Sequence, residues 1–292
     1  MTDAMEALPP MTSPSPAKRF NWINLRVRVL SATVLVPTVV AAVWFGGVWY
    51  LGLISVCVAL LAREWGMMSA PKAPIGVGVA VGVASLVALV AAFRGHYYLT
   101  GPLLVVGAIL AGLLARGAVE RRADAAYGVI YIAPACIALI WLRLLEAGLS
   151  WTLLLFVVTW FADIFAFVTG SIFKGPKLWP KFSPNKTWSG FFGGLVAASL
   201  GAVGIDALTT WLPTLPDMNL TWPIAAFIGL LGGLSTMMGD LWESMLKRRF
   251  GVKDSGDLIP GHGGMLDRVD GLMFAAIVIA GVRLIYLAGW AR

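Results

Sequence analysis

Charged residues are scarce in this sequence of 292 residues. Aspartate, glutamate, lysine and arginine together make up 13% of the chain, about half the level that is usual in soluble domains. Hydrophobic residues make up 59%, and apolar runs of roughly 17–22 residues recur, each long enough to cross the ~30 Å hydrocarbon core of a bilayer. The shortage of charge therefore excludes an ordinary soluble domain and predicts a polytopic membrane protein.

Cysteine is nearly absent as well. Cys57 and Cys136 both lie inside apolar runs, at a separation that suits neither a metal site nor a disulfide framework. We interpret both as small buried side chains. The formal net charge of +7 could indicate a nucleic-acid partner, but the basic residues lie between the apolar runs, as membrane topology requires. We therefore expect a lipid bilayer and no nucleic acid as partner.

The apolar runs divide the chain into a tail and one transmembrane domain. Residues 1–20 contain four prolines and few apolar side chains, which predicts a disordered N-terminal tail. Residues 21–292 are expected to form a single domain, an all-α polytopic transmembrane helix bundle, because a span in lipid must satisfy its own backbone hydrogen bonds. We expect nine spans, at about residues 28–45, 47–62, 74–93, 101–116, 126–145, 151–172, 189–212, 222–240 and 270–290.

The loops between these spans indicate the orientation. With the N-terminus in the cytoplasm, 18 of the 22 lysines and arginines fall on the cytoplasmic side, as the positive-inside rule predicts. The same orientation puts two polar segments, residues 160–190 and 239–271, at the cytoplasmic face. We see no internal repeat of the kind that is typical of transporters. These two segments are the candidate catalytic regions.

The second polar segment concentrates acidic residues beside two apolar helices. Asp240 is expected to close one span, and Asp267 and Asp270 to open the next on one helix face, because they are three residues apart. A helix-cap role for Asp267 alone is the simpler interpretation. Several carboxylates at the bilayer surface nevertheless favour a functional site, and oxygen ligands of this kind suit Mg²⁺. We expect Mg²⁺, alone or with a second cation.

Glycine and basic residues complete this segment. Gly263 and Gly264 follow His262, and a helix start follows them, which is the arrangement of an anion cradle. A hinge and a plain loop histidine are the alternatives. Lys247, Arg248, Lys253 and Arg268 could neutralise phosphates, although basic residues here also anchor the helix ends at the headgroups.

The first polar segment contains 183-SPNKTWSG-190 ahead of an expected span. Ser183, Lys186 and Thr187 are candidate phosphate contacts, with a helix N-cap as the other role for the hydroxyls. A Walker A loop is rejected, because Pro176 stands where its lysine should be and no soluble strand precedes it. Asp163 lies inside an apolar run, where a lone acid needs a cation or a base as partner.

The run 244-SMLKRRFGVKDSGDLIPGHGGMLDRVD-270 resembles the signature of the bacterial phosphatidate cytidylyltransferases, also called CDP-diacylglycerol synthases. A second block is similar too, from Ala162-Asp163 through Lys177-Leu178 to Lys186-Thr187-Trp188 and Gly190. Ser171 and the order Phe173-Lys174-Gly175 depart from the family pattern, so residues 171–175 are given no role. The likeness covers roughly residues 130–290.

The resemblance implies a reaction of CTP with phosphatidic acid that gives CDP-diacylglycerol and pyrophosphate, with Mg²⁺, in phospholipid biosynthesis. It also implies a homodimer and a multi-pass protein of the cell inner membrane whose active site faces the cytoplasm. The candidate residues then take three roles. The catalytic set is Lys186, Lys247, Arg248, His262 and Asp267. The substrate-binding set is Ser183, Lys186, Thr187, Lys253, Gly263, Gly264 and Arg268. The metal ligands are Asp163, Asp240, Asp267 and Asp270.

Other functions were weighed against this one. A nucleotidyltransferase acting on an isoprenoid lipid phosphate would need similar loops, so only a substrate test separates it. A CDP-alcohol phosphotransferase fits poorly, because no acidic residue follows Asp270. A transporter would place its charges near the midplane rather than at one face.

Overall fold

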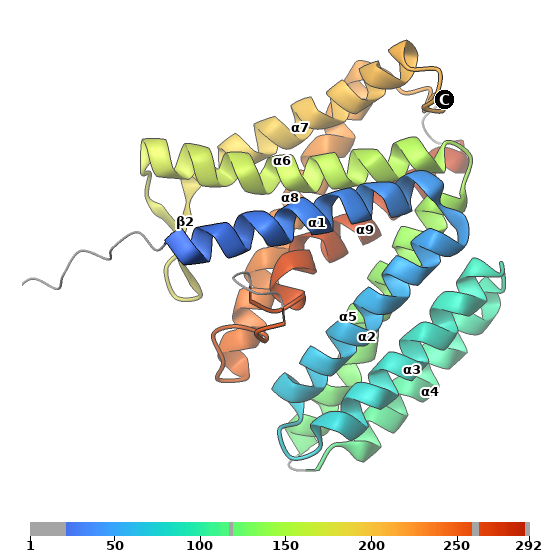
Figure 1. The fold of residues 1–292 in the computed structure, drawn as a ribbon, viewed down its shortest axis with the longest axis vertical. Coiled ribbons are helices and arrows are strands. Elements are labelled where there is room, and N and C mark those ends of the chain that lie inside the picture. Colours follow the sequence, from blue (N-terminus) through green and yellow to red (C-terminus); the bar gives the residue numbers. More distant parts are fainter. Residues whose placement is uncertain (1–21, 117–118, 259–262, 290–292) are drawn as a thin grey trace, which may run out of the picture.

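The computed structural model describes residues 22–116, 119–258 and 263–289, and these ranges contain nine α-helices and one β-hairpin (Figure 1). The helices are α1 (Trp22–Phe45), α2 (Gly47–Ser69), α3 (Pro74–Phe93), α4 (Tyr97–Leu114), α5 (Val119–Leu144), α6 (Gly148–Phe173), α7 (Trp188–Trp211), α8 (Trp222–Arg249) and α9 (Leu266–Leu287). The predicted all-α fold class is confirmed. The expected disordered tail at residues 1–20 lies outside the described residues.

Eight of the helices in the described ranges, α2 to α9, are long and apolar enough to cross a membrane. The described side chains of α1 form an apolar stretch over Thr33–Phe45. The helices coincide with the nine expected spans to within a few residues at most ends, because an unbroken apolar run leaves helix as the only way to pair the backbone in lipid. The chain is therefore an integral membrane protein.

Two helices continue well past the C-terminal end that the apolar runs alone predict. α8 continues to Arg249 rather than ending near residue 240, so Asp240 lies within the helix instead of closing it. The extension is held by an ion pair one turn apart, between Glu243 and Lys247. α2 continues to Ser69, which places Glu64 inside a helix. Both extensions carry charged side chains beyond the apolar part of the helix.

A β-hairpin between α6 and α7 was not expected. β1 (Lys177–Trp179) pairs antiparallel with β2 (Ser183–Thr187), with Lys177 opposite Thr187. α6 ends at Lys174, whose φ of +45° is left-handed, and Pro176 cannot continue a helix. After β2 the chain enters α7, and Trp188 N at the start of α7 donates a hydrogen bond to Pro176 O at 3.0 Å.

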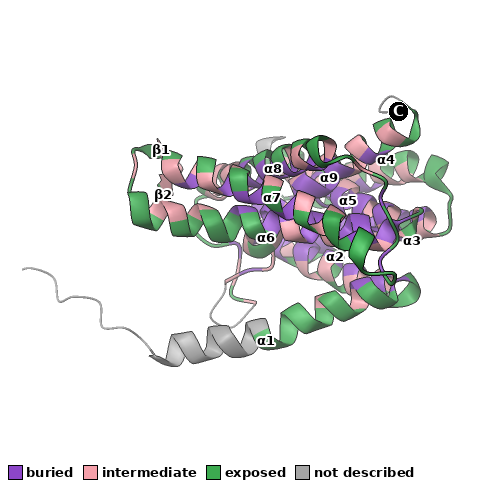
Figure 2. Ribbon diagram, turned by 90° about the horizontal axis from the view of Figure 1, so that it is seen from above, coloured by how far each residue is buried: buried purple, intermediate pink, exposed green. Residues whose placement is uncertain are grey.

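Helices α2–α5 pack together, and so do α6–α9 with the hairpin (Figure 1). Small residues allow the close contacts, as is usual between helices in membranes. A Cβ on Gly66 of α2 would lie 2.8 Å from Gly78 N of α3, and one on Gly190 of α7 would lie 2.6 Å from Ala166 O of α6. Figure 2 shows buried residues concentrated in the middle of the bundle, as along α5 and α8, and exposed residues along the described part of α1.

Candidate active site

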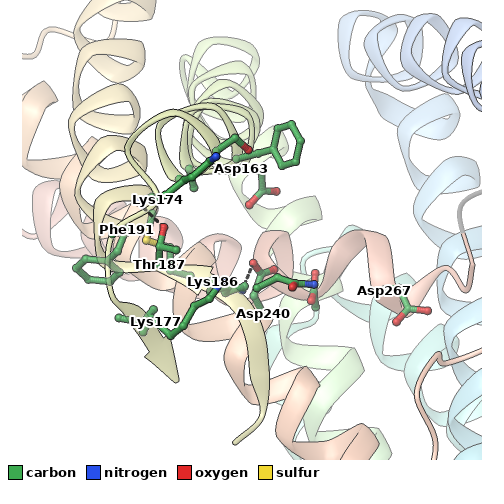
Figure 3. Close-up of a pocket in the computed structure, with 18 of the residues that line it drawn as sticks. Asp163, Lys174, Lys177, Lys186, Thr187, Phe191, Asp240 and Asp267 are labelled. Carbon is green, nitrogen blue, oxygen red and sulfur yellow. Dashed lines mark hydrogen bonds and ion pairs between the residues drawn. The ribbon is translucent and has the colours of Figure 1, made fainter. Parts of the chain in front are cut away.

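A cavity of about 810 Å³ lies where α6, the hairpin, α7, α8 and α9 meet (Figure 3). All of its lining residues fall between Asp163 and Asp270. The two polar segments singled out from the sequence, 160–190 and 239–271, are therefore brought to one place by the fold. The hairpin forms one side of the cavity, and α6, α7, α8 and α9 form the rest.

The lining of the cavity is charged to a degree that is unusual for this chain. Its basic side chains are Lys174, Lys177, Lys186 and Arg268. Its acidic side chains are Asp163, Asp240, Asp267 and Asp270. Such a mixture at the end of a membrane bundle favours binding of a polyanion together with a cation.

Lys186 and Asp240 form the central ion pair of the cavity. β2 carries Lys186 toward α8, and its Nζ lies 2.5 Å from Asp240 Oδ2 (Figure 3). Both side chains are partly buried. Partial burial of an ion pair costs desolvation energy, and its position in a cavity makes both partners candidates for ligand contacts.

Asp163 and Asp270 face the same cavity from two other helices. Asp270 is buried in α9, with its Oδ1 accepting from Gly271 N at 2.8 Å. α8 and α9 approach closely here, because a Cβ on Gly239 would lie 2.5 Å from Asp270 O. Asp163 projects from α6 toward the cavity (Figure 3). Carboxylates from α6, α8 and α9 therefore line a single space.

Asp267 is held by a network of donors at the start of α9. Its Oδ1 lies 2.5 Å from Lys247 Nζ. Its Oδ2 accepts from Ser255 N at 3.0 Å, Ser255 Oγ at 2.8 Å and Gly264 N at 3.0 Å. Asp267 lies at the edge of the cavity, apart from the Lys186–Asp240 pair (Figure 3). Both of its oxygens are engaged by the protein.

Lys247 connects α8 to this network without lining the cavity. Its Nζ lies 2.6 Å from Glu243 Oε2 and 2.5 Å from Asp267 Oδ1. Glu243 is buried at 1% exposure, and its Oε1 has no hydrogen-bond partner within the described residues. The charge of Lys247 is thus used to hold two carboxylates in place.

The structure separates the remaining predicted residues into those near the cavity and those away from it. Thr187 lines the cavity, and its Oγ1 also accepts from Gly190 N at 3.2 Å, which is the N-cap role weighed above. Gly264 contacts Asp267, and Gly263 precedes it with a φ of +83°. Ser183 begins β2 and does not line the cavity.

Two further predicted residues of the described chain do not reach the cavity. Arg248 and Lys253 are exposed and are absent from its lining. His262 lies outside the described residues. These residues stay predictions, as does the assignment of roles to the others.

Sequence reasoning left four charged residues of this region out of the assigned site residues. Lys174 and Lys177 line the cavity, although Lys177 was noted only within the block that resembles the family and Lys174 lies in the segment 171–175, to which no role was given. Glu243 holds Lys247. Glu64 of α2 accepts hydrogen bonds from the start of α9, at Met265 N and Leu266 N. A lone acid beside an apolar run should have pointed to Glu64, but the expected span stopped two residues before it.

The carboxylates fit a magnesium ion in part. Among the residues the structure describes, no three or more histidine, cysteine, aspartate or glutamate side chains are arranged to enclose a metal on their own. Mg²⁺, however, is usually bound by one or two carboxylates together with substrate phosphates. Asp240 and Asp270, on closely packed helices, and Asp163 opposite them supply such donors. Asp267 would need to exchange one of its present partners to join them.

The fold and the cavity define a class, a polytopic membrane protein with a charged cavity among its helices. A family model described as "Cytidylyltransferase family" matches residues 26–286. A phosphatidate cytidylyltransferase of Brucella abortus biovar 1 (strain 9-941) is 37% identical over 88% of this chain and 92% of its own length. One from Rickettsia felis is 32% identical over 88% of this chain and 91% of its own.

The chain therefore belongs to the cytidylyltransferase family, a family of nucleotidyltransferase enzymes. This confirms the family resemblance and the enzyme class predicted from the sequence. The match with the family begins within α1 and ends within α9, so it includes residues 26–100, where the sequence patterns alone had shown only apolar spans.

Proposed function

We propose that this protein transfers the cytidylyl group of CTP to phosphatidic acid, giving CDP-diacylglycerol and pyrophosphate. The observation that carries the proposal is the cavity, which brings four basic and four acidic side chains together among α6, the hairpin, α8 and α9. On this proposal the lipid phosphate enters the cavity from the bilayer, and the nucleotide enters it from water. The family and the names of the relatives agree with this substrate pair.

The reaction needs charge compensation more than proton transfer. An oxygen of the lipid phosphate forms a bond to the α-phosphorus of CTP, and the bond from that phosphorus to the oxygen bridging to the β-phosphate breaks, so that pyrophosphate leaves. The attacking phosphate is already largely ionised at neutral pH and needs no strong general base. Positioning and electrostatic stabilisation are then the main contributions of the protein.

The residues of the cavity divide this work. Lys186, Lys174 and Lys177 come from the hairpin and the end of α6, where they can neutralise the triphosphate. Arg268 extends the positive charge to α9. Lys247 holds Asp267 and Glu243 and, through them, the start of α9. Thr187 keeps β2 joined to α7 by its cap. A triphosphate drawn to Lys186 would release Asp240 from its ion pair.

A bound Mg²⁺ would supply Lewis-acid stabilisation of the triphosphate. Asp240, Asp270 and Asp163 are the residues that would hold it, with Asp267 as the further predicted ligand. The orientation with this cavity toward the cytoplasm, the location in the inner membrane and the homodimer belong to the same proposal. The positive-inside distribution supports the orientation.

A substrate panel tests the proposal. The purified protein is incubated in detergent micelles with phosphatidic acid and Mg²⁺, and with CTP, ATP, GTP or UTP in turn, while pyrophosphate and lipid product are measured. We expect CDP-diacylglycerol with CTP alone and its loss on addition of EDTA. Turnover only with an isoprenoid-ether phosphate would change the acceptor. No turnover with either lipid, from folded protein, would contradict a cytidylyltransferase and return attention to transport.

A further inference from the structure

Glu64 is a fully buried carboxylate in α2, a helix that contributes nothing to the lining of the cavity. Its Oε1 accepts from Met265 N at 2.7 Å, and its Oε2 accepts from Leu266 N at 2.8 Å and Ser255 Oγ at 3.2 Å. A buried carboxylate costs free energy unless its oxygens are paired. Its three donors all belong to the segment around the start of α9, about two hundred residues away in the chain.

The start of α9 depends on this contact. The N-cap residue, Met265, provides no side-chain cap, yet the first backbone N–H groups of a helix need acceptors. Glu64 supplies two acceptors from another helix, and its negative charge suits the positive end of the helix dipole. A carboxylate from α2 therefore caps α9 in place of a local residue.

The same contact extends to Asp267. Ser255 donates through its Oγ to both Glu64 Oε2 and Asp267 Oδ2, and its N–H also donates to Asp267. Gly264 lies between the two carboxylates. A Cβ there would collide with Ser255 Oγ and lie 2.9 Å from both oxygens of Glu64. Glu64, Ser255 and Gly264 thus form one layer of contacts against Asp267.

We infer that Glu64 is a positioning residue for the reaction, which fixes Ser255 and the start of α9 so that Asp267 and Asp270 face the cavity. This inference rests on the proposed function for its kinetic part. Under this inference α2 contributes to catalysis, although none of its residues lines the cavity. Glu64 therefore acts on the reaction through its contacts with Ser255 and the start of α9.

The test compares Glu64→Gln with Glu64→Asp. The amide of Gln has one acceptor oxygen, so its NH₂ group must face a backbone N–H, whereas Asp keeps two oxygens on a shorter stem. We expect Glu64→Gln to lower kcat about 10- to 100-fold in folded protein, the scale of a small misplacement of catalytic groups. The KM for CTP should change less than about 3-fold, because Lys174, Lys177 and Lys186 are untouched. Glu64→Asp should recover part of kcat.

A second readout needs no turnover. Hydrogen exchange of the Met265 and Leu266 amides should become at least about 10-fold faster in Glu64→Gln, because both amides lose a carboxylate acceptor. Ser69→Ala is the matched control: Ser69 is buried on the same helix, and its hydroxyl bonds only Trp65 O within that helix. We expect wild-type kcat and exchange at α9 for this control.

Wild-type kcat and wild-type exchange in Glu64→Gln would overturn the inference. If Glu64→Gln fails to fold, Ser255→Ala decides, because it removes only the hydroxyl that joins the two carboxylates. Lower kcat with faster exchange at Met265 would support the inference, and wild-type values for both would overturn it. If the wild-type protein makes no CDP-diacylglycerol at all, the proposed function fails, while the exchange measurement still decides whether Glu64 orders the start of α9.

Discussion

The two halves of the bundle use the same kind of helix for different purposes. Helices α2–α5 pack through small and apolar side chains, as at Gly66 and Gly78. Helices α6–α9 and the hairpin pack just as closely, yet they also surround a cavity with eight charged side chains. The comparison shows that the described lining of this cavity comes entirely from the second half. Glu64 is the point at which a charged group of α2 enters the second half.

The largest expected effect comes from Asp267 in the charged half. Asp267→Asn replaces one of two engaged oxygens by an NH₂ group and removes the charge that faces Lys247. We expect turnover to fall by about 10³-fold or more, the scale seen when a preorganised electrostatic group is lost, while the protein still inserts and purifies. The measurement is the rate of CDP-diacylglycerol formation. Asp254→Asn, an exposed aspartate absent from the cavity lining, is the control and should keep its activity.

Lys186 should give the next largest effect. Lys186→Met removes the cation that pairs with Asp240 at the centre of the cavity, and we expect kcat/KM for CTP to fall about 100-fold, as for loss of a charge-assisted contact. Lys181→Met, in the exposed turn of the same hairpin, should stay within about 2-fold of wild type, since its ammonium lies against the Phe182 ring outside the cavity. Equal losses in both variants would contradict a specific role for Lys186.

Lys247 should affect stability as well as activity. Lys247→Met leaves Glu243 and Asp267, both nearly buried, without their shared cation. Breaking a buried pair in this way costs about 3 kcal/mol or more. Arg249→Met breaks an ion pair to Asp124 whose arginine is 55% exposed, and such a pair contributes at most about 1 kcal/mol. Thermal unfolding in detergent compares the two, and a smaller loss for Lys247→Met would show that its pairs contribute little.

The first half should show the opposite pattern, lower stability with unchanged chemistry. Gly66→Ala would force a Cβ into the α2–α3 contact, 2.8 Å from Gly78 N, and overpacking of this kind costs about 1–3 kcal/mol. Gly76→Ala is the control, because its Cβ would meet Leu114 Cβ at 3.9 Å, an ordinary contact. We expect Gly66→Ala to unfold at a lower temperature than wild type, while the folded protein keeps wild-type kcat. A lower kcat with wild-type stability would break the division between the halves.

The sequence predicts the spans well because the rule behind them is local. An apolar run such as residues 74–93 has no alternative to helix in lipid, and α3 has these bounds. The same rule predicts nothing beyond the first charged residues, so the last turns of α8 were not predicted. The hairpin was missed because Ser183-Pro184-Asn185-Lys186-Thr187 has neither the alternation nor the composition of an ordinary strand.

The site was predicted in its residue types but not in its contacts. Acids and bases near helix ends indicated a phosphate and metal site, and Asp163, Lys186, Asp240 and Asp270 do line one cavity. Which base pairs with which acid depends on how α8, α9 and the hairpin pack, and that is not a local property. Glu64 is the extreme case, since its donors at Met265 and Leu266 are remote in the chain.

The position of a labelled phosphate tests the central claim most directly. CTP labelled with ³²P at the α-phosphate or at the γ-phosphate is given to the purified protein with phosphatidic acid and Mg²⁺, and lipid and aqueous products are separated. The account predicts that the α-label enters the lipid and the γ-label leaves as pyrophosphate. Label from the γ-position in the lipid, or from neither position with folded protein, would contradict cytidylyl transfer in this cavity.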